Sequence, residues 1–555
     1  MKKRILMVAT SLALALSMLA TGCGNTDKTP GTNTPAPTGA AETNAPAAAG
    51  GKITINLGSE PPRMNPILST DSTSGNVQRH VFEGLTKLGK DGKPIPGVAE
   101  KWEKSADGLK YTFTLRDAKW SDGSAITADD FKYSILTLLK KDTAAEYAYL
   151  GYYIKGGEAF NTGKGKEEDV GVKVLDPKKL EITLEKPAPF LLDLLAFHAF
   201  MPVKKDFYEK QDGGKKYGAE PNTMLYNGPY TISSWQHEDN LVLTKNPNYW
   251  NAKEIKLDEV KMMMIKDSNT ILNTFKAGEI DMVGLTGDQV TLLKGEGKTP
   301  VNYYDGSTWY FEFNTADPLL KNLNIRKALA GAIDRNAFIT GVLKNNSKPA
   351  YSFTNPVIFD DKGGSFAATV GAPFVKDNDP EAKALFEKGL KELGLDKAPK
   401  VEMIGDDSDT ARKNMQAFQE MWKKNLGLEV TLTNLPFQAR LDRMTNKQFS
   451  IVMAGWSADY NDPISFLDLW ETTNGNNHTN YSNPNYDKLV KDVQNEADAA
   501  KRMASLRELE KIAMTDLPVA PIYFRARDYI TNPKLKGVVR TFGQDIDLYW
   551  AYLEK

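Results

Sequence analysis

The chain has 555 residues but a single cysteine, Cys23, and this count restricts how its fold can be held together. One thiol cannot form a disulfide within the chain or supply the thiolates of a structural zinc site. Small exported domains often depend on such cross-links because their cores are small. This chain must instead be held by its hydrophobic core, and 41% hydrophobic residues suit that. Residues 52–555 are too many for one simple core, so we expect two or three domains.

The residues before Cys23 have the pattern of an export signal. A basic tip is followed by an uncharged run over residues 5–19 and by small residues at 20–22. The run is shorter than the ~20 residues of a membrane-spanning helix. Residues 19–22 (LATG) before Cys23 resemble the lipobox of bacterial lipoproteins. An ordinary signal peptide would require the only thiol to fall there by chance, so we expect removal of residues 1–22 and a lipid anchor on Cys23.

Residues 24–51 contain no large apolar side chain. A segment of this composition cannot bury enough surface to offset the entropy lost on ordering. It predicts a disordered tether that joins Cys23 to a folded body beginning at residue 52. No later segment reaches membrane-spanning length without charge.

The charge balance gives no support for a nucleic-acid partner. The formal net charge is −1, and removal of Lys2, Lys3 and Arg4 takes it to −4. Binding to nucleic acid or to an anionic membrane surface calls for a basic excess. We expect neither interaction from the folded body.

Hydrophobic patterns predict a mixed α/β fold. Residues 52–57 and 111–115 alternate between apolar and polar side chains, as half-buried strands do. The sequence TADD at residues 127–130 is a capping pattern for a following helix. Another helix is expected from Asp379, which precedes a proline, to Gly394.

An αβ unit is predicted further along the chain. Residues 428–432 alternate as in a strand, and Gly427 before them suits the end of a helix. A helix followed directly by a strand is expected to pack beside a sheet. The preceding helix presents large apolar residues at helical spacing, namely Met415, Phe418, Trp422 and Leu426.

Motifs of catalysis and of metal binding are nearly absent. There is no nucleophile elbow, and residues 297–299 (GKT) lack the earlier glycine of a phosphate loop, because Leu292 stands there. The cluster at residues 406–409 (DDSD) lacks the glycine and distal glutamate of a calcium loop. We therefore expect no metal, no cofactor and no catalytic residue, although a glycosidase pair of carboxylates could be hidden in the fold. The histidines are scattered, without the spacing of metal ligands: His80, His198, His237 and His478.

Segments in the middle and C-terminal parts carry a family resemblance. They are residues 99–131 (from AEKW to TADDF), 227–250 (NGPY to LTKNPNYW), 313–335 (FNT, IRKAL, AIDR) and 455–463 (GWSADYNDP). In this order they resemble the large extracytoplasmic peptide-binding proteins of ABC importers, solute-binding protein family 5. The oligopeptide-binding group is the most similar.

The resemblance implies a bilobed α/β fold of the periplasmic-binding-protein type II class, with an extra domain and a hinge between two lobes around a ligand cleft. We expect lobe I at residues 52–83, 206–305 and 527–555, the extra domain at 84–205, and lobe II at 306–526. Such a protein, expected as a monomer, captures extended oligopeptides and delivers them to an ABC permease. One alternative is the same fold with another ligand, such as a dipeptide, a metal chelate, a sugar or a signalling peptide. The other is an exported hydrolase.

The resemblance also implies a binding site. Asp459 matches the aspartate that receives the α-ammonium of the peptide in oligopeptide-binding relatives, although it could instead be a turn or core residue. The peptide would pair main chain to main chain with the protein. Some relatives hold the peptide carboxylate with an arginine where this chain has Met453, so that end is not assigned. The other expected ligand-binding residues are Ser72, Thr73, Ser74, Tyr147, Phe437, Gly455, Trp456, Ser457 and Tyr460.

Overall fold

The computed structural model describes residues 50–541 and 544–555. Cys23, with the predicted signal peptide and most of the predicted tether, lies outside the described residues. The first strand, β1 (Lys52–Asn56), begins where the folded body was predicted to begin. Helices and strands follow in mixed order, so the prediction of a mixed α/β fold is confirmed. Within the described part of the chain, every helix is too short or too polar to cross a membrane.

An 11-stranded mixed sheet forms the centre of the fold. Its hydrogen-bonded order is β15 (Val430–Leu435), β14 (Val401–Asp406), β16 (Ile451–Ser457), β12 (Val301–Phe313), β17 (Val519–Thr531), β11 (Met282–Leu285), β1, β10 (Glu259–Met263), β9 (Asn240–Lys245) and β8 (Tyr230–Gln236), with β13 (Lys348–Pro349) paired to β17. Strands far apart in sequence, such as β1 and β10, are neighbours in this sheet.

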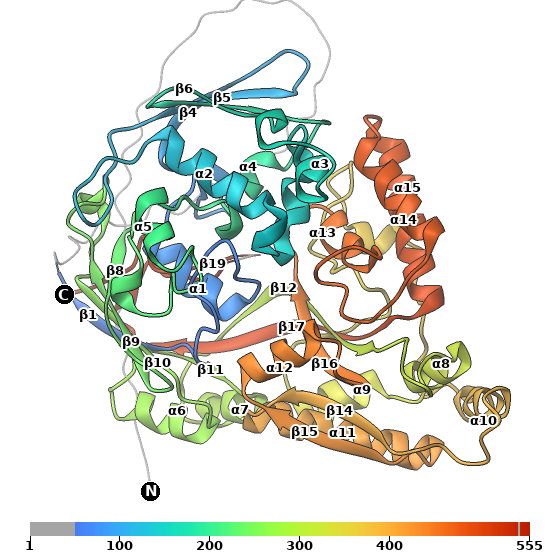
Figure 1. Ribbon diagram of the computed structural model, residues 1–555. Helices are drawn as coiled ribbons and strands as arrows, with labels where there is room; N and C mark the ends of the chain where they lie inside the picture. The colour runs from blue at the N-terminus through green and yellow to red at the C-terminus, as the bar shows by residue number, and fades with distance from the viewer. Residues whose placement is uncertain (1–49, 542–543) are drawn as a thin grey trace, which may run out of the picture. The chain divides into compact units, whose positions relative to one another are not determined.

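The strands β12 and β17 are 13 residues each and run antiparallel through the middle of the sheet (Figure 1). Their register shifts between Tyr304 and Thr308, and Gly306 within this interval has a φ of 76°. Asp305 accepts hydrogen bonds from Nε of Arg525 at 2.6 Å and Nε of Arg527 at 2.7 Å. The interruption lies between the part of the sheet that contains β1 and the part that contains β16.

Residues 84–205 carry a second sheet of four antiparallel strands. Its order is β4 (Ala99–Lys104), β5 (Lys110–Leu115), β7 (Lys179–Thr183) and β6 (Val172–Asp176). Helix α2 (Ala128–Leu139) packs near it and begins at the predicted capping box, in which Oδ2 of Asp130 accepts from the amide of Thr127 at 2.9 Å. The 3₁₀ helix η2 (Glu146–Tyr153) follows α2 and reaches toward the cavity described below.

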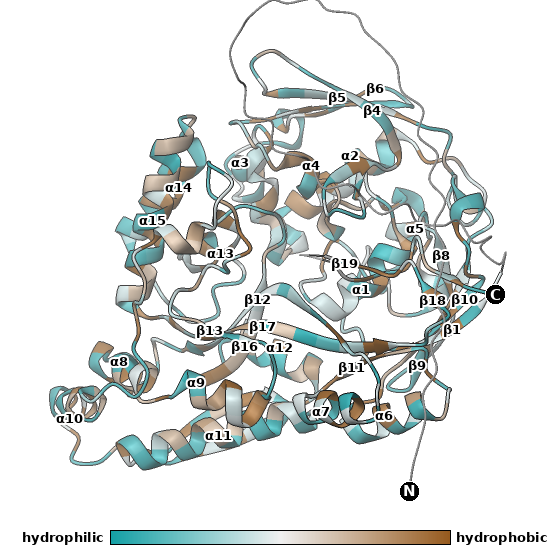
Figure 2. Cartoon of the chain, turned by 180° about the vertical axis from the view of Figure 1, so that it is seen from behind, coloured by the Kyte–Doolittle hydropathy of each residue, from teal (hydrophilic) through white to brown (hydrophobic). Residues whose placement is uncertain are grey.

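The predicted αβ unit is present. Helix α11 (Asp409–Leu426) ends at Gly427, which has a φ of 74°, and β15 follows. Trp422 is fully buried, and its Nε1 donates to the carbonyl of Leu329 at 2.9 Å. Figure 2 shows hydrophobic and hydrophilic residues alternating around α11, as an amphipathic helix requires.

One helix begins later than predicted. Helix α10 spans Ala382–Glu392, whereas the sequence pattern indicated a start at Asp379. Asp379 Oδ1 accepts from the amide of Glu381, and its carbonyl accepts from the amide of Ala382. These bonds form a turn ahead of the helix, so the Asp-Pro pair precedes the first helical turn.

The remaining elements surround these sheets. The helices are α1 (Ser72–Val81), α3 (Gly157–Asn161), α4 (Leu191–Leu194), α5 (Lys205–Lys210), α6 (Ser268–Lys276), α7 (Gly287–Gly295), α8 (Leu323–Gly331), α9 (Arg335–Phe338), α12 (Phe437–Thr445), α13 (Ile464–Leu467), α14 (Pro484–Asn495) and α15 (Ala499–Asp516). The short strands are β2 (Thr86–Leu88), β3 (Pro94–Pro96), β18 (Leu535–Lys536), β19 (Val539–Thr541), β20 (Gln544–Asp547) and β21 (Tyr552–Leu553).

Candidate functional site

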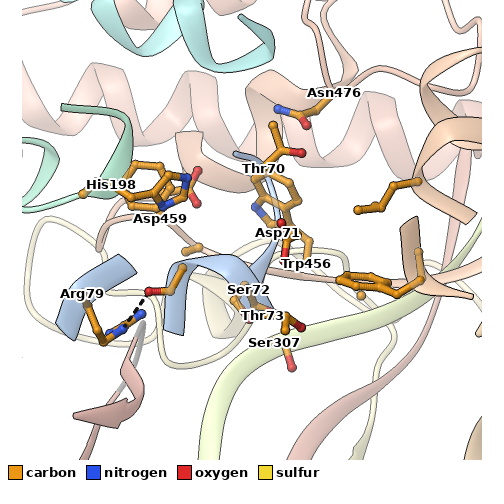
Figure 3. Close-up of a pocket in the computed structure, with 18 of the residues that line it drawn as sticks. Thr70, Asp71, Ser72, Thr73, Arg79, His198, Ser307, Trp456, Asp459 and Asn476 are labelled. Carbon is orange, nitrogen blue, oxygen red and sulfur yellow. Dashed lines mark hydrogen bonds between the residues drawn. The ribbon is translucent and has the colours of Figure 1, made fainter. Parts of the chain in front are cut away.

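A cavity of about 570 Å³ lies where α1, η2, α12, the end of β16 and the loop at residues 474–478 meet. Figure 3 shows some of its lining residues, among them Thr73, Trp456, Asp459 and Asn476. These residues come from distant parts of the sequence, and the fold brings them to one place. The volume is within the range of small-ligand sites in proteins.

The start of α1 forms one wall. Asp71 caps this helix, and its Oδ1 accepts from the amide of Ser74 at 2.7 Å. Burial raises the pKa of Asp71 to about 6. Ser72 and Thr73 line the cavity, whereas Ser74 is buried away from it and its Oγ accepts from the amide of Arg63.

The end of β16 forms the opposite wall. Gly455, Trp456 and Ser457 all line the cavity. A side chain at position 455 would meet the ring of Trp309 at 2.9 Å, so the glycine allows the two strands to lie as they do. Trp456 is fixed by a hydrogen bond from its Nε1 to the carbonyl of Ser465, at 2.8 Å.

Asp459 lines the cavity immediately beyond β16. Its Oδ1 accepts a hydrogen bond from the hydroxyl of Tyr147 at 3.3 Å, and its amide donates to Oγ of Ser465 at 2.9 Å. Its Oδ2 is buried and has no hydrogen-bond partner among the described residues. Burial raises the pKa of Asp459 well above its usual value. A buried carboxylate of this kind favours a cation as its partner.

The second aspartate of the same motif is different. Asp462 forms a bidentate ion pair with Arg502, at 2.7 and 2.9 Å. Both side chains are largely buried, and Asp462 does not line the cavity. Asp462 is therefore a structural residue, although the sequence alone does not distinguish it from Asp459.

Two further predicted residues line the cavity, and one does not. Tyr147 reaches it from η2 and Phe437 from α12. Tyr460 is not among the lining residues; its ring stacks on Phe190 with centroids 4.4 Å apart. Met453 lies in the wall of an adjoining cavity of about 330 Å³.

A charged group in the cavity wall was not predicted from the sequence. Nε2 of His478 lies 3.9 Å from Oε2 of Glu146, and its Nδ1 lies 3.6 Å from Oε2 of Glu312. All three residues line the cavity. The two carboxylates outweigh the effect of burial and raise the pKa of His478 to about 9. The three residues are far apart in the sequence, so no spacing could have indicated this group.

The described part of the chain contains no group of His, Cys, Asp and Glu side chains that could hold a metal ion. The cavity instead offers backbone at Ser72 and at the end of β16, aromatic walls, and a buried carboxylate at Asp459. This combination suits a ligand that carries a cation and main-chain hydrogen-bonding groups.

Comparisons with known proteins agree with this description. The oligopeptide-binding protein OppA of Bacillus subtilis is 39% identical over 554 residues, which cover 97% of both chains. The structure of Listeria monocytogenes OppA bound to peptide matches with a TM-score of 0.87 and 34% identity, over 91% of this chain and 99% of the other. The bilobed type II fold expected from the resemblance is therefore confirmed.

Two structures of one relative indicate the arrangement of the described residues. The murein tripeptide-binding protein MppA of Escherichia coli matches with a TM-score of 0.83 over 92% of this chain and 99% of the other. Its unliganded open form matches with a TM-score of only 0.59, although the match covers 91% of this chain and 98% of the other at the same 30% identity. The described residues therefore do not have the arrangement of that open form. The family model of bacterial extracellular solute-binding proteins, family 5 Middle, matches residues 93–478, and this chain belongs to that family.

Proposed function

We propose that this chain is the peptide-binding subunit of an ABC import system and that it binds oligopeptides by their free amino end. The observation that carries the proposal is Asp459, a buried carboxylate in the cavity wall with one oxygen that has no hydrogen-bond partner. The names of the relatives in Bacillus subtilis and Listeria monocytogenes support oligopeptides as the ligand class.

A peptide α-ammonium supplies the cation that Asp459 favours. An ammonium removed from water costs several kcal/mol unless a carboxylate pairs with it. The backbone near Ser72 and Thr73 and at Gly455–Ser457 can pair with the main chain of an extended ligand, and such pairing does not depend on the side chains of the peptide. The site therefore selects a free amino end and an extended backbone rather than one sequence.

Ligand capture involves closure of two lobes. We assign lobe I to residues 52–83, 206–305 and 527–555, lobe II to 306–526, and an extra domain to 84–205. The boundary at 305/306 falls within the interrupted pairing of β12 and β17, and the boundary at 526/527 lies directly beside it, which supports a hinge there. Closure presents both lobes to the permease. The ATPases of the transporter then drive release of the peptide, and this chain itself catalyses no reaction.

The family consists of extracellular solute-binding proteins, so the chain acts outside the cytoplasm. We propose that acyl groups on Cys23 hold it at the membrane beside its permease. The sequence around Cys23 supports this anchor, and the Discussion gives its test.

Calorimetry with matched peptides tests the binding mode. Asp459→Asn keeps the shape of the side chain but leaves the α-ammonium buried without a counter-ion. We expect the variant to bind a free-amine tetrapeptide ~10²–10³-fold more weakly than wild type, because a broken buried ion pair costs about 3–5 kcal/mol. An N-acetylated tetrapeptide should bind wild type weakly and lose much less on the same substitution.

Asp407→Asn is the control, because Asp407 lines the same cavity but is paired with Lys266 at 3.1 Å. It should affect both peptides equally. A coupling energy near zero between Asp459 and the amino group would contradict the proposal. So would a different solute, such as a sugar or a metal chelate, identified by mass spectrometry in the purified protein.

A further inference from the structure

The 3₁₀ helix η2, in the 84–205 segment, meets the loop at residues 474–478 very closely. A Cβ atom added to Gly475 would lie 2.7 Å from the carbonyl oxygen of Glu146 and 2.8 Å from its Cα. Both atoms belong to backbone, which cannot move aside as a side chain can. Gly475 does not have a positive φ, so this approach, and not the backbone conformation, requires glycine here.

An ionic contact joins the same two segments. His478 lies between Glu146 of η2 and Glu312 of β12, at 3.9 and 3.6 Å. Its side chain is 11% exposed and that of Glu312 is 3% exposed. Nδ1 of His478 and Oε2 of Glu312 have no hydrogen-bond partner among the described residues, so they interact as an ion pair without a hydrogen bond. Other titratable and charged groups face the two carboxylates. Tyr310 on β12 interacts with Glu312 and with Arg440 on α12. Tyr147, next to Glu146, interacts with Glu146, Asp459 and Asp71.

Other contacts between the segments lie alongside. The Tyr147 hydroxyl donates to Asp459, the Phe190 ring stacks on Tyr460, and Lys186 Nζ donates to Oε1 of Gln494 at 3.0 Å. Each pair joins residues 84–205 to residues 456–502. Separation of these segments would break all of them, and the described residues do not have the arrangement of the open form of MppA.

We propose that Glu146, Gly475, His478 and Glu312 form a closing contact, which stabilises the closed cleft to the same extent whatever peptide is bound. This inference rests on the proposed function. A protein that must close to bind has an apparent Kd equal to its intrinsic Kd divided by the closed fraction. The closing contact raises that fraction and lowers the Kd of every ligand by one common factor. Recognition of the amino group belongs to Asp459 and is separate.

Charge makes the closing contact depend on pH. With the segments together, His478 lies between two carboxylates, and its pKa is about 9, against 6.5 for the free side chain. Glu312 belongs to the same lobe as His478, so closure adds the carboxylate of Glu146 to this group. The stabilisation is fully present below pH ~6.5 and is lost as the pH rises through ~9. The peptide amine also loses its proton over a similar pH range, which lowers affinity in any variant. The contribution of His478 is therefore measured as the difference in pH dependence of Kd between wild type and His478→Gln with the same peptide.

Two substitutions and a matched control test the inference on the full chain. Gly475→Ala introduces the backbone clash without a change in charge, and His478→Gln removes the cation. Gly295→Ala is the control, because a Cβ at that position meets nothing within 4 Å. The probes are four free-amine tetrapeptides that begin with Ala, Lys, Glu or Phe and are otherwise identical. We expect both variants to raise Kd about tenfold for all four peptides and the control to leave Kd unchanged.

A double substitution checks the ionic part. Glu146→Gln together with His478→Gln should weaken binding little more than either substitution alone, because both remove the same contact. His478→Gln should also flatten the fall in affinity between pH 7 and 9.5 relative to wild type.

Unchanged Kd values in Gly475→Ala and His478→Gln would overturn the inference. A loss confined to peptides with one kind of first residue would also overturn it, since His478 would then contact the ligand side chain directly. If wild type binds none of the peptides, the proposed function fails but the inference remains testable. Small-angle scattering of the ligand-free protein should then give a larger radius of gyration for Gly475→Ala than for wild type and Gly295→Ala, and equal radii would reject the closing contact.

Discussion

At the scale of single residues, the motif at 455–463 holds two aspartates with opposite surroundings. Asp462 is paired with Arg502, whereas Asp459 has one oxygen without a hydrogen-bond partner. Sequence reasoning selected Asp459 through the resemblance to a family, because the motif itself gives both the same weight. The physical difference lies in Arg502, a residue some 40 positions away that no local pattern points to.

Substitutions of the two aspartates should have opposite effects on stability. Asp462→Asn should lower the free energy of unfolding of the ligand-free protein by about 3–5 kcal/mol, because it leaves a buried guanidinium unpaired. Asp459→Asn should leave that free energy unchanged or raise it, since it removes a buried carboxylate. Chemical denaturation at pH 7 measures both. Equal losses would mean that Asp459 is as structural as Asp462.

The pH dependence supplies a second measurement on Asp459. Its folded-state pKa lies well above the value of 3.8 for the free side chain, so the folded state retains a proton that the unfolded state has lost. Its contribution to stability is therefore present below pH ~3.8 and is lost as the pH rises through the folded-state pKa. Wild type should gain stability relative to Asp459→Asn as the pH falls from 7 toward 4.

Other residues show where prediction from the sequence ends. Ser72 and Thr73 line the cavity as expected, but Ser74 points into the protein, because successive helical side chains leave the axis about 100° apart. Tyr460 was expected at the ligand and stacks on Phe190 instead. The direction of a side chain depends on the packing of its element, which one sequence does not reveal.

At the scale of elements, the sequence was most informative where periodicity and a terminator agree. The apolar spacing on α11 and the glycine that follows it predicted a helix and its end, and Met415, Phe418 and Trp422 are fully buried. The start of α10 was predicted at Asp379 and lies instead at Ala382, because an Asp-Pro pair suits a turn as well as a helix start. The hydrogen bonds of Asp379 resolve it as a turn.

The end of α11 gives a prediction about stability without an effect on binding. Gly427 has a φ of 74°, a left-handed conformation in which a Cβ atom is unfavourable by about 1–2 kcal/mol. Gly427→Ala should lower the free energy of unfolding by roughly 1 kcal/mol, measured by denaturant titration. Gly427→Asn should cost less, because asparagine tolerates this conformation. Peptide affinity should stay the same in both variants, and a loss of affinity would mean that α11 is coupled to the cleft.

At the scale of the whole molecule, the family resemblance gave the class of fold, but one sequence could not give the relation between its parts. The interruption between Tyr304 and Thr308 in β12 contains Asp305-Gly306, a pair typical of a turn, and yet the chain continues through it as one strand of the central sheet. The contacts of Gly475 and His478 with Glu146 join segments more than 300 residues apart. Such contacts follow from tertiary structure and have no local signature.

The anchor at Cys23 can be tested apart from the cleft. Cys23 and the residues up to 49 lie outside the described residues, so the proposal rests on the sequence. One acyl chain binds a membrane only reversibly, with K of about 10⁴ M⁻¹, whereas two or more give stable attachment, and a lipoprotein cysteine carries at least two. Cys23→Ala should therefore move the protein from the membrane fraction to the medium, measured by fractionation and immunoblot. Its affinity for the free-amine tetrapeptide should equal that of wild type, because β1 begins only at Lys52. If the variant stays with membranes in both low and high salt, attachment does not depend on the acyl groups. If it is released but no longer binds peptide, the N-terminal segment contributes to the fold.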